Sequence, residues 1–256
     1  MTRIVISLTI GLMLVLLGCG ASSGETPTTD VDRSLQLVRE GVKKANAGNT
    51  LGAVELFSLS LKIWKRNPFA YLNRGKVFLI QGQLKKALSD INKAVKRMPE
   101  YAPAYLARGV ARRRIGDFSR ALKDFNKAVE LDPKNRTARM ERAELMFYAG
   151  QPETALQDLN TVIRLSRDSN KALGNRAYIL LEMGHHDAAI KDLKKLLASD
   201  PKNLNAAKHL ASIYKRKGEY VKALRWFKTA LSLETDSKAR KRLQKEMTGL
   251  RANKAR

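Results

Sequence analysis

The sequence predicts an all-α protein, a right-handed α-solenoid of six helix-turn-helix repeats, each about 34 residues long, with a C-terminal capping helix. The first observation is an ungapped match between residues 68–99 and 102–133, which aligns Tyr71 with Tyr105 and Asp90 with Asp124. The second is a glycine at positions 48, 82, 116, 150, 184 and 218, each followed five residues later by an alanine. A fixed period of about 20 to 50 residues indicates a repeat array.

Both halves of each repeat carry apolar residues at helical spacing, as in residues 84–97. Small residues such as Gly75 and Gly109 are expected to let the first helix of a pair approach its neighbour closely. Pro99 and Pro133 follow second helices and should end them. Because a single hairpin cannot bury its apolar face, we expect the hairpins to stack, each contacting only its neighbours.

These residues resemble the tetratricopeptide repeat family, whose pattern contains aromatic, Gly, Ala, Phe and Pro positions at set spacing. The pattern is carried in the second repeat by Tyr71, Gly75, Phe78, Ala87, Ile91 and Pro99, and in the third by Tyr105, Gly109, Ala121, Phe125 and Pro133. The resemblance implies repeats at 34–67, 68–101, 102–135, 136–169, 170–203 and 204–235, with residues 236–256 as a basic capping helix and tail. Arg112, where the family usually has an aromatic residue, departs from the pattern.

Residues 1–33 predict a lipid-anchored protein. Residues 4–17 form a short apolar run, which suits a signal peptide over residues 1–18. The run ends in Leu16-Leu17-Gly18-Cys19, which resembles the bacterial lipobox, and Cys19 is the only cysteine. The resemblance implies acylation of Cys19 and a place in the bacterial cell envelope. Because Gly20 rather than aspartate follows, an outer-membrane site facing the periplasm is favoured. The alternative is an uncleaved anchor with an incidental cysteine.

Residues 19–33 are rich in Ser, Thr, Gly and Pro and are predicted to be a flexible tether. The formal net charge of +25 and the pI near 10.3 indicate attraction to anionic partners or surfaces. The basic tail carries Leu243, Met247 and Leu250 at i, i+4 and i+7, which form a narrow apolar stripe. It has three interpretations: a helix that caps the sixth repeat, a helix that docks on anionic lipid, or a nucleic-acid site. Export to the envelope argues against nucleic acid.

Arginine and aspartate recur together, at one constant spacing, in repeats two to five. The pairs are Arg74–Asp90, Arg108–Asp124, Arg142–Asp158 and Arg176–Asp192. Repeats one and six lack both partners, so we expect structural ion pairs between the two helices of one hairpin.

The resemblance places a partner-binding groove on one face of the first helices. Carried onto this sequence, the groove comprises Lys76, Leu79, Arg113, Met140, Glu144, Phe147, Lys171, Tyr178, Leu181, Lys208, Ser212 and Lys215. We call this set of residues the predicted groove face. The family's chaperone-tail clamp pattern is absent. Aromatic and apolar residues flanked by cations favour an extended protein segment of acidic character.

No catalytic motif or cofactor site is found, so no enzymatic activity, cofactor or metal is expected. His185, His186 and Asp187 adjoin one another at a turn, where neighbouring side chains point apart. The predicted function is a lipid-anchored interaction scaffold or adaptor. In architecture it resembles the tetratricopeptide lipoproteins that serve secretins, type IV pili or peptidoglycan hydrolases. The alternative is a binding protein for an anionic envelope polymer or membrane surface.

Overall fold

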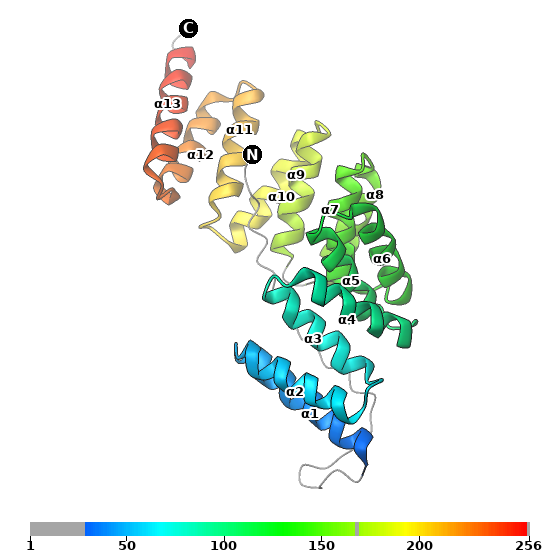
Figure 1. Ribbon diagram of the computed structural model, residues 1–256. Coiled ribbons are helices and arrows are strands. Elements are labelled where there is room, and N and C mark those ends of the chain that lie inside the picture. The colour runs from blue at the N-terminus through cyan, green and yellow to red at the C-terminus, as the bar shows by residue number, and fades with distance from the viewer. Residues whose placement is uncertain (1–28, 167–168, 255–256) are drawn as a thin grey trace. The chain divides into compact units, whose positions relative to one another are not determined.

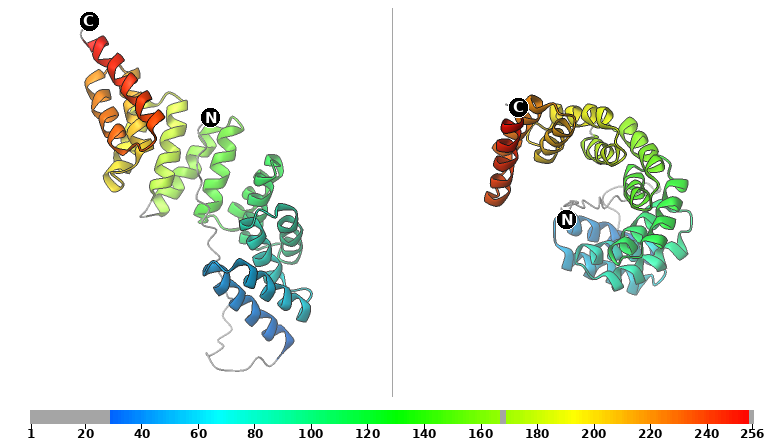
Figure 2. Two further views of the ribbon diagram at one scale, coloured as in Figure 1. Left: turned by 60° about the vertical axis from the view of Figure 1, so that its left-hand side comes forward. Right: turned by 90° about the horizontal axis from the view of Figure 1, so that it is seen from above.

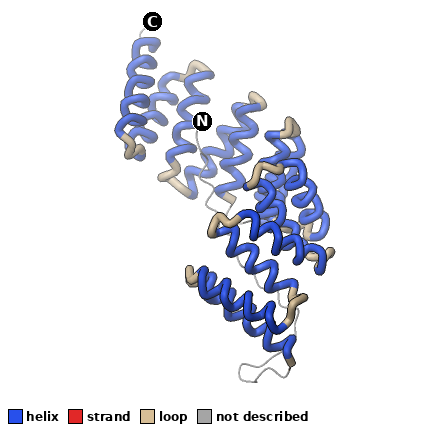
Figure 3. The backbone as a smooth tube through the Cα atoms, viewed as in Figure 1, coloured by secondary structure: helices blue, strands red, loops and turns tan. Residues whose placement is uncertain are grey.

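The computed structural model describes residues 29–166 and 169–254, and within them every element is a helix (Figures 1 and 3). The helices are α1 (Asp30–Asn46), α2 (Thr50–Ile63), α3 (Pro68–Ile80), α4 (Leu84–Arg97), α5 (Ala102–Arg114), α6 (Phe118–Leu131), α7 (Arg136–Tyr148), α8 (Pro152–Leu165), α9 (Asn170–Glu182), α10 (His186–Ser199), α11 (Leu204–Arg216), α12 (Tyr220–Leu233) and α13 (Ser237–Lys254). This is the predicted fold class: helix-turn-helix repeats followed by one further helix.

The chain divides into two compact units, with the boundary between Ala138 and Arg139 in α7. In the N-terminal unit α1 packs on α2, α3 on α4 and α5 on α6, and each hairpin contacts the next. In the C-terminal unit α9 packs on α10 and α11 on α12, and α13 covers α12 (Figure 2). The first helices of successive hairpins also contact one another, α1 with α3 and α3 with α5.

The turn of each hairpin depends on its glycine. Gly82 has φ +72°, a left-handed conformation that side chains other than glycine rarely adopt. There the amide of Gln83 donates to the carbonyl of Phe78 at 2.8 Å, which closes the end of α3. The five equivalent glycines also have positive φ, so one turn geometry serves all six hairpins.

The first three hairpins pack tightly because a second type of glycine lies inside their first helices. A Cβ built on Gly75 would lie 2.6 Å from Ile91 Cγ1, and one on Gly109 would lie 2.5 Å from Phe125 Cε1. Carbon atoms do not approach so closely, so any side chain here would force the facing residue to move. The predicted close approach of paired helices is therefore explained: each glycine leaves space that a large residue of the second helix fills.

A buried polar cluster joins the first hairpin to the second. The Asn67 side chain accepts from the amides of Phe69 and Ala70 at the start of α3, and its Nδ2 donates to Ser34 Oγ at 2.9 Å. Ser34 Oγ in turn donates to the Ser60 carbonyl at 2.9 Å. Hydrogen bonding within the cluster compensates for the burial of these polar groups.

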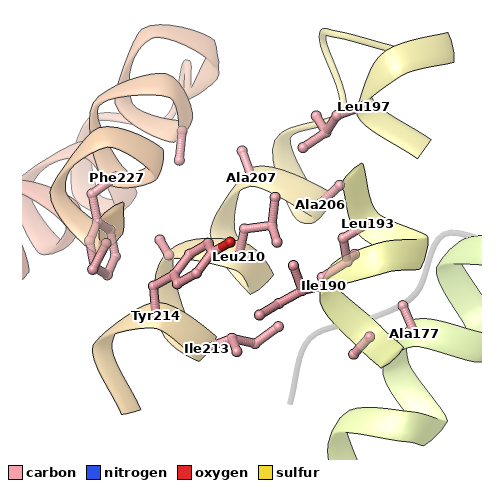
Figure 4. Close-up of a cluster of buried hydrophobic side chains, with 14 of the residues drawn as sticks. Ala177, Ile190, Leu193, Leu197, Ala206, Ala207, Leu210, Ile213, Tyr214 and Phe227 are labelled. Carbon is pink, nitrogen blue, oxygen red and sulfur yellow. The ribbon is translucent and has the colours of Figure 1, made fainter. Parts of the chain in front are cut away.

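Among the described residues, the largest hydrophobic cluster lies in the C-terminal unit. There α10, α11 and α12 bring Ile190, Leu193, Leu210 and Phe227 together (Figure 4). Helix α13 closes this core with Leu243, Met247 and Leu250, all buried. These are the three residues of the apolar stripe expected for a capping helix. The stripe is therefore used in packing within the protein.

The predicted tether over residues 19–33 is too long. Helix α1 begins at Asp30, because Thr29 caps it by accepting from the Asp32 amide at 3.1 Å. The predicted signal peptide and Cys19 lie outside the described residues. Among the helices described, none combines the length and hydropathy needed to cross a membrane.

Candidate partner-binding face

All four predicted arginine–aspartate pairs lie within ion-pair distance inside their hairpins. The shortest distances are 2.7 Å for Arg74–Asp90, 2.8 Å for Arg108–Asp124, 2.6 Å for Arg142–Asp158 and 2.6 Å for Arg176–Asp192. The aspartates are buried and the arginines are about one fifth exposed. In the first, third and fourth pairs, Nε and Nη2 bind separate carboxylate oxygens, the geometry of a strong ion pair. These residues hold each hairpin together and are occupied in doing so.

Two further arginines bind aspartates of these pairs, and the sequence did not predict either of them. Arg112 Nη1 binds Asp124 at 2.8 Å, and Arg139 Nη1 binds Asp158 at 2.6 Å. Arg112 is the residue that departs from the family pattern, and it acts as a second cation on a buried carboxylate. Asp192, in contrast, is bound by Arg176 alone among the described residues.

The part of the predicted groove face in the N-terminal unit differs from the expectation. Leu79 is fully buried, and its carbonyl accepts from Arg114 Nη1 at 2.6 Å. Its side chain is therefore core, and naming it as a partner contact was wrong, because α5 covers the end of α3. Arg113, on α5, is half-buried.

Lys76 is the most unusual member of the predicted groove face. It lies on α3, and only 6% of the residue is exposed. No carboxylate lies within ion-pair distance of its Nζ in the described part of the chain. Burial without a counter-charge lowers the pKa of Lys76 to about 8, so at neutral pH the protein carries a buried, uncompensated cation.

The C-terminal unit carries a row of aromatic rings across three first helices. Phe147 of α7 lies edge-on to Tyr178 of α9, with ring centroids 5.6 Å apart. The ring of Tyr178 lies 6.5 Å from the ring of His209 of α11. All three side chains are partly exposed, so the rings are accessible to another molecule. We call Phe147, Tyr178 and His209 the aromatic row.

His209 was not among the predicted groove residues, although the sequence contains a signal for it. The interval from Phe147 to Tyr178 equals that from Tyr178 to His209, and each is shorter than the repeat period by about one helical turn. Residues at this spacing lie one turn earlier on each successive first helix, so the spacing predicts a row that runs diagonally across these helices. Burial lowers the pKa of His209, an effect that the charge of Glu182 opposes. Burial also raises the pKa of the Tyr178 hydroxyl, and Glu182 acts in the same direction.

Two lysines of the predicted groove face are neutralised within the chain. Lys208 Nζ lies 2.5 Å from Glu234, and Lys215 Nζ lies 2.5 Å from Glu246. The hydrogen bond from Lys208 lowers the pKa of the Glu234 carboxyl. These two lysines, predicted as cations of the groove, already have carboxylate partners from the end of α12 and from helix α13.

The remaining predicted positions are accessible to differing degrees. Lys171 is exposed, and Met140, Glu144, Leu181 and Ser212 are half-buried. At the histidine-containing turn, Asp187 pairs with Lys217 at 2.6 Å, and this hydrogen bond lowers the pKa of Asp187. No group of acidic or histidine side chains suited to a metal ion occurs in the described residues.

Comparison with known proteins supports the repeat assignment independently. Three models described as "Tetratricopeptide repeat" match residues 70–101, 102–135 and 180–246, which is about half of the chain. Tetratricopeptide repeat protein 36 of Caenorhabditis elegans is 42% identical over 62 residues, covering 24% of this chain and 35% of that protein. The homologue from Nematostella vectensis is 30% identical over 79 residues, covering 31% and 44%. The chain thus matches less than half the length of these relatives.

Solved structures of low sequence identity share the fold. The structure of pilF from Pseudomonas aeruginosa gives a TM-score of 0.74 at 16% identity, covering 85% of this chain and 99% of that one. YrrB, described as a TPR protein with an unusual peptide-binding site, gives 0.65 at 21%, covering 75% and 99%. A tetratricopeptide repeat protein from Parabacteroides merdae gives 0.66 at 18%, covering 87% and 88%. With its six turn glycines and paired helices, the chain belongs to the tetratricopeptide repeat family, whose repeat arrays are scaffolds for protein–protein interaction.

Proposed function

We propose that this scaffold is anchored by lipid in the bacterial cell envelope, where it binds an extended, acidic segment of a protein partner. The anchor is proposed from the lipobox resemblance at Cys19. The partner's chemistry is proposed from the first-helix face, and the observation that carries it is Lys76. A role as adaptor in envelope assembly, by analogy with the tetratricopeptide lipoproteins of secretins, pili or hydrolases, is part of the same proposal.

The argument from Lys76 is one of free energy. An uncompensated buried ammonium group destabilises the folded chain, and an apolar residue of similar length would remove that cost. A partner carboxylate placed against Nζ would supply the missing counter-charge in a site that is already partly desolvated, where the attraction is stronger than in water. The residue is thus poorly suited to stability and well suited to binding an acidic side chain.

The aromatic row supplies the second component of binding in the C-terminal unit. Exposed aromatic rings are the side chains most often found as anchors in protein interfaces. Phe147, Tyr178 and His209 offer adjoining apolar surface on three helices, to which an apolar or aromatic partner residue can bind. Because Lys208 and Lys215 are already paired, the aromatic row rather than these two lysines supplies the main contact on this unit.

The test begins with capture of partners from detergent-solubilised envelopes and identification of those bound in stoichiometric amount. The affinity of the purified partner is then measured for wild type, Lys76→Met and the double variant Phe147→Ala/Tyr178→Ala. We expect Lys76→Met to weaken binding by about tenfold, the loss of a charge-assisted contact. The aromatic variant should weaken it by about thirtyfold, because both rings are anchors.

Lys85→Met is the matched control, because Lys85 is an exposed lysine on the neighbouring helix α4. It should bind as wild type does. Unchanged binding by both test variants, together with loss of binding on deletion of residues 237–256, would move the site to the basic C-terminal helix. Recovery of anionic polymer instead of a discrete protein would favour the alternative function, for which the net charge of +25 is the motivating observation.

A further inference from the structure

A cleft between α12 and α13 lies apart from the predicted groove face and has a composition of its own. It has a volume of about 320 Å³ and is lined by Val221, Leu224, Arg225, Lys228 and Arg251. Two of these side chains are apolar, three are cationic and none is acidic. A cleft with this lining suits an anion that is attached to an apolar body.

The apolar side of the cleft is accessible to a ligand. Val221 is 64% exposed, although it lies on a helix whose other face is packed in the core. In α13, Leu243, Met247 and Leu250 are buried against the rest of the C-terminal unit. Helix α13 therefore cannot insert its own apolar stripe into a bilayer, and Val221 with Leu224 is the apolar surface that the cleft offers to a ligand.

The positive charge of the cleft is not neutralised within the described chain. Arg225, Lys228 and Arg251 form no ion pair with any described residue, and three acids at the two ends of α12 and on α13 are already paired with lysines. Glu219 binds Lys222, Glu234 binds Lys208 and Glu246 binds Lys215. An incoming anion would not have to displace a carboxylate.

A second cationic surface lies on the solvent face of α13. Lys238, Lys241, Arg242 and Lys245 are all exposed and lie at i, i+3, i+4 and i+7, which is one face of a helix. This stripe extends well beyond a single bound anion. A surface that presents many anions at once, as an anionic membrane does, can engage both the cleft and the stripe.

We propose that the cleft binds the phosphate headgroup of an anionic phospholipid, and that the stripe on α13 lies against the neighbouring headgroups. The guanidinium groups of Arg225 and Arg251 suit phosphate oxygens, which they can bind through two parallel N–H donors. Val221 and Leu224 contact the glyceryl part of the lipid. An acidic peptide would satisfy the charges but has no need of the exposed valine, and for this reason lipid is favoured. The site is independent of partner binding on the first helices.

The test is co-sedimentation with vesicles of phosphatidylcholine, with and without phosphatidylglycerol. The full chain carries Cys19→Ser, so that no acyl chain contributes, and the gain in binding on adding phosphatidylglycerol is the measured quantity. We expect Arg225→Ala/Lys228→Ala/Arg251→Ala to reduce this gain by at least about tenfold, given the attraction of each basic residue to an anionic surface.

The matched control is Lys85→Ala/Lys123→Ala/Lys191→Ala, which removes the same charge from exposed positions on α4, α6 and α10. It should keep most of the gain, and circular dichroism of both triple variants should match wild type. Equal loss in both variants would overturn the cleft in favour of net charge alone. The proposal would also be overturned if soluble polyglutamate competed for the protein as strongly as added phosphatidylglycerol vesicles do. Capture of the protein partner should be unchanged in the cleft variant, which separates this proposal from the one above.

Discussion

Gly109 and Phe125 are packed so closely that a single methyl group could not be placed between them. A Cβ on Gly109 would lie 2.5 Å from Phe125 Cε1 and 2.7 Å from Cδ1, closer than carbon atoms approach without a shift of one of them. The glycine lies on α5 and the phenylalanine on α6, the second helix of the same hairpin. This contact sets how near α5 and α6 can come.

Gly109→Ala should destabilise the protein by about 1 to 3 kcal/mol, the usual cost of overpacking a core. Gly174→Ala is the control, since Gly174 is also inside a first helix but its Cβ would meet only Leu196 at 3.7 Å, an ordinary contact. There the higher helix propensity of alanine should stabilise by about 0.5 to 1 kcal/mol. Urea unfolding of both variants measures the difference, and a change of the same sign in both would contradict the packing argument.

Removing one arginine should lower the free energy of unfolding by different amounts in different arginine–aspartate pairs. Arg176→Leu leaves the buried Asp192 with no cation among the described residues and should cost about 1 to 3 kcal/mol. Arg108→Leu leaves Asp124 bound to Arg112, so the loss should be smaller by about 1 kcal/mol. Adding Asp192→Ala to Arg176→Leu should recover part of the stability. The double-mutant cycle is measured by urea unfolding, and strictly additive losses would mean that the pair does not interact.

Lys76→Met should raise the free energy of unfolding at neutral pH, and the gain over wild type should be smaller at high pH. The folded pKa of Lys76 is about 8 and the unfolded value is 10.5, so between these values the unfolded chain binds more protons and stability rises with pH. Below the folded pKa the full penalty applies, and methionine should gain about 1 to 3 kcal/mol there. Unfolding free energies of variant and wild type at pH about 7 and about 10 measure this. A gain independent of pH would show that the charge is not its cause.

Cys19→Ser should yield a chain that is not acylated and remains unprocessed or soluble, because no other cysteine can accept the lipid. Metabolic labelling with a fatty acid, followed by fractionation of the envelope, measures both effects. Should the variant still occur in membranes as a processed and labelled form, the lipobox interpretation would have to be abandoned.

The sequence alone predicted the hairpins, because their determinants are local or lie within one repeat. Gly82 and its equivalents recur at the turns, and apolar residues recur at helical spacing. The pairing of Arg74 with Asp90 could be inferred as well, since both residues belong to one hairpin and appear together in four repeats. Leu243, Met247 and Leu250 indicated a capping helix by the same helical period.

Tertiary structure decided which charged residues are already paired and which side chains are covered. Lys208 and Lys215 looked available in the sequence, yet Glu234 and Glu246 reach them from beyond their own helices. Leu79 is buried because α5 packs against the end of α3. The isolation of Lys76 and the cleft beside Val221 likewise depend on which groups neighbouring helices bring close. A repeated pattern determines the form of each hairpin, whereas pairing and exposure at its surface depend on contacts between helices that the repeat period does not encode.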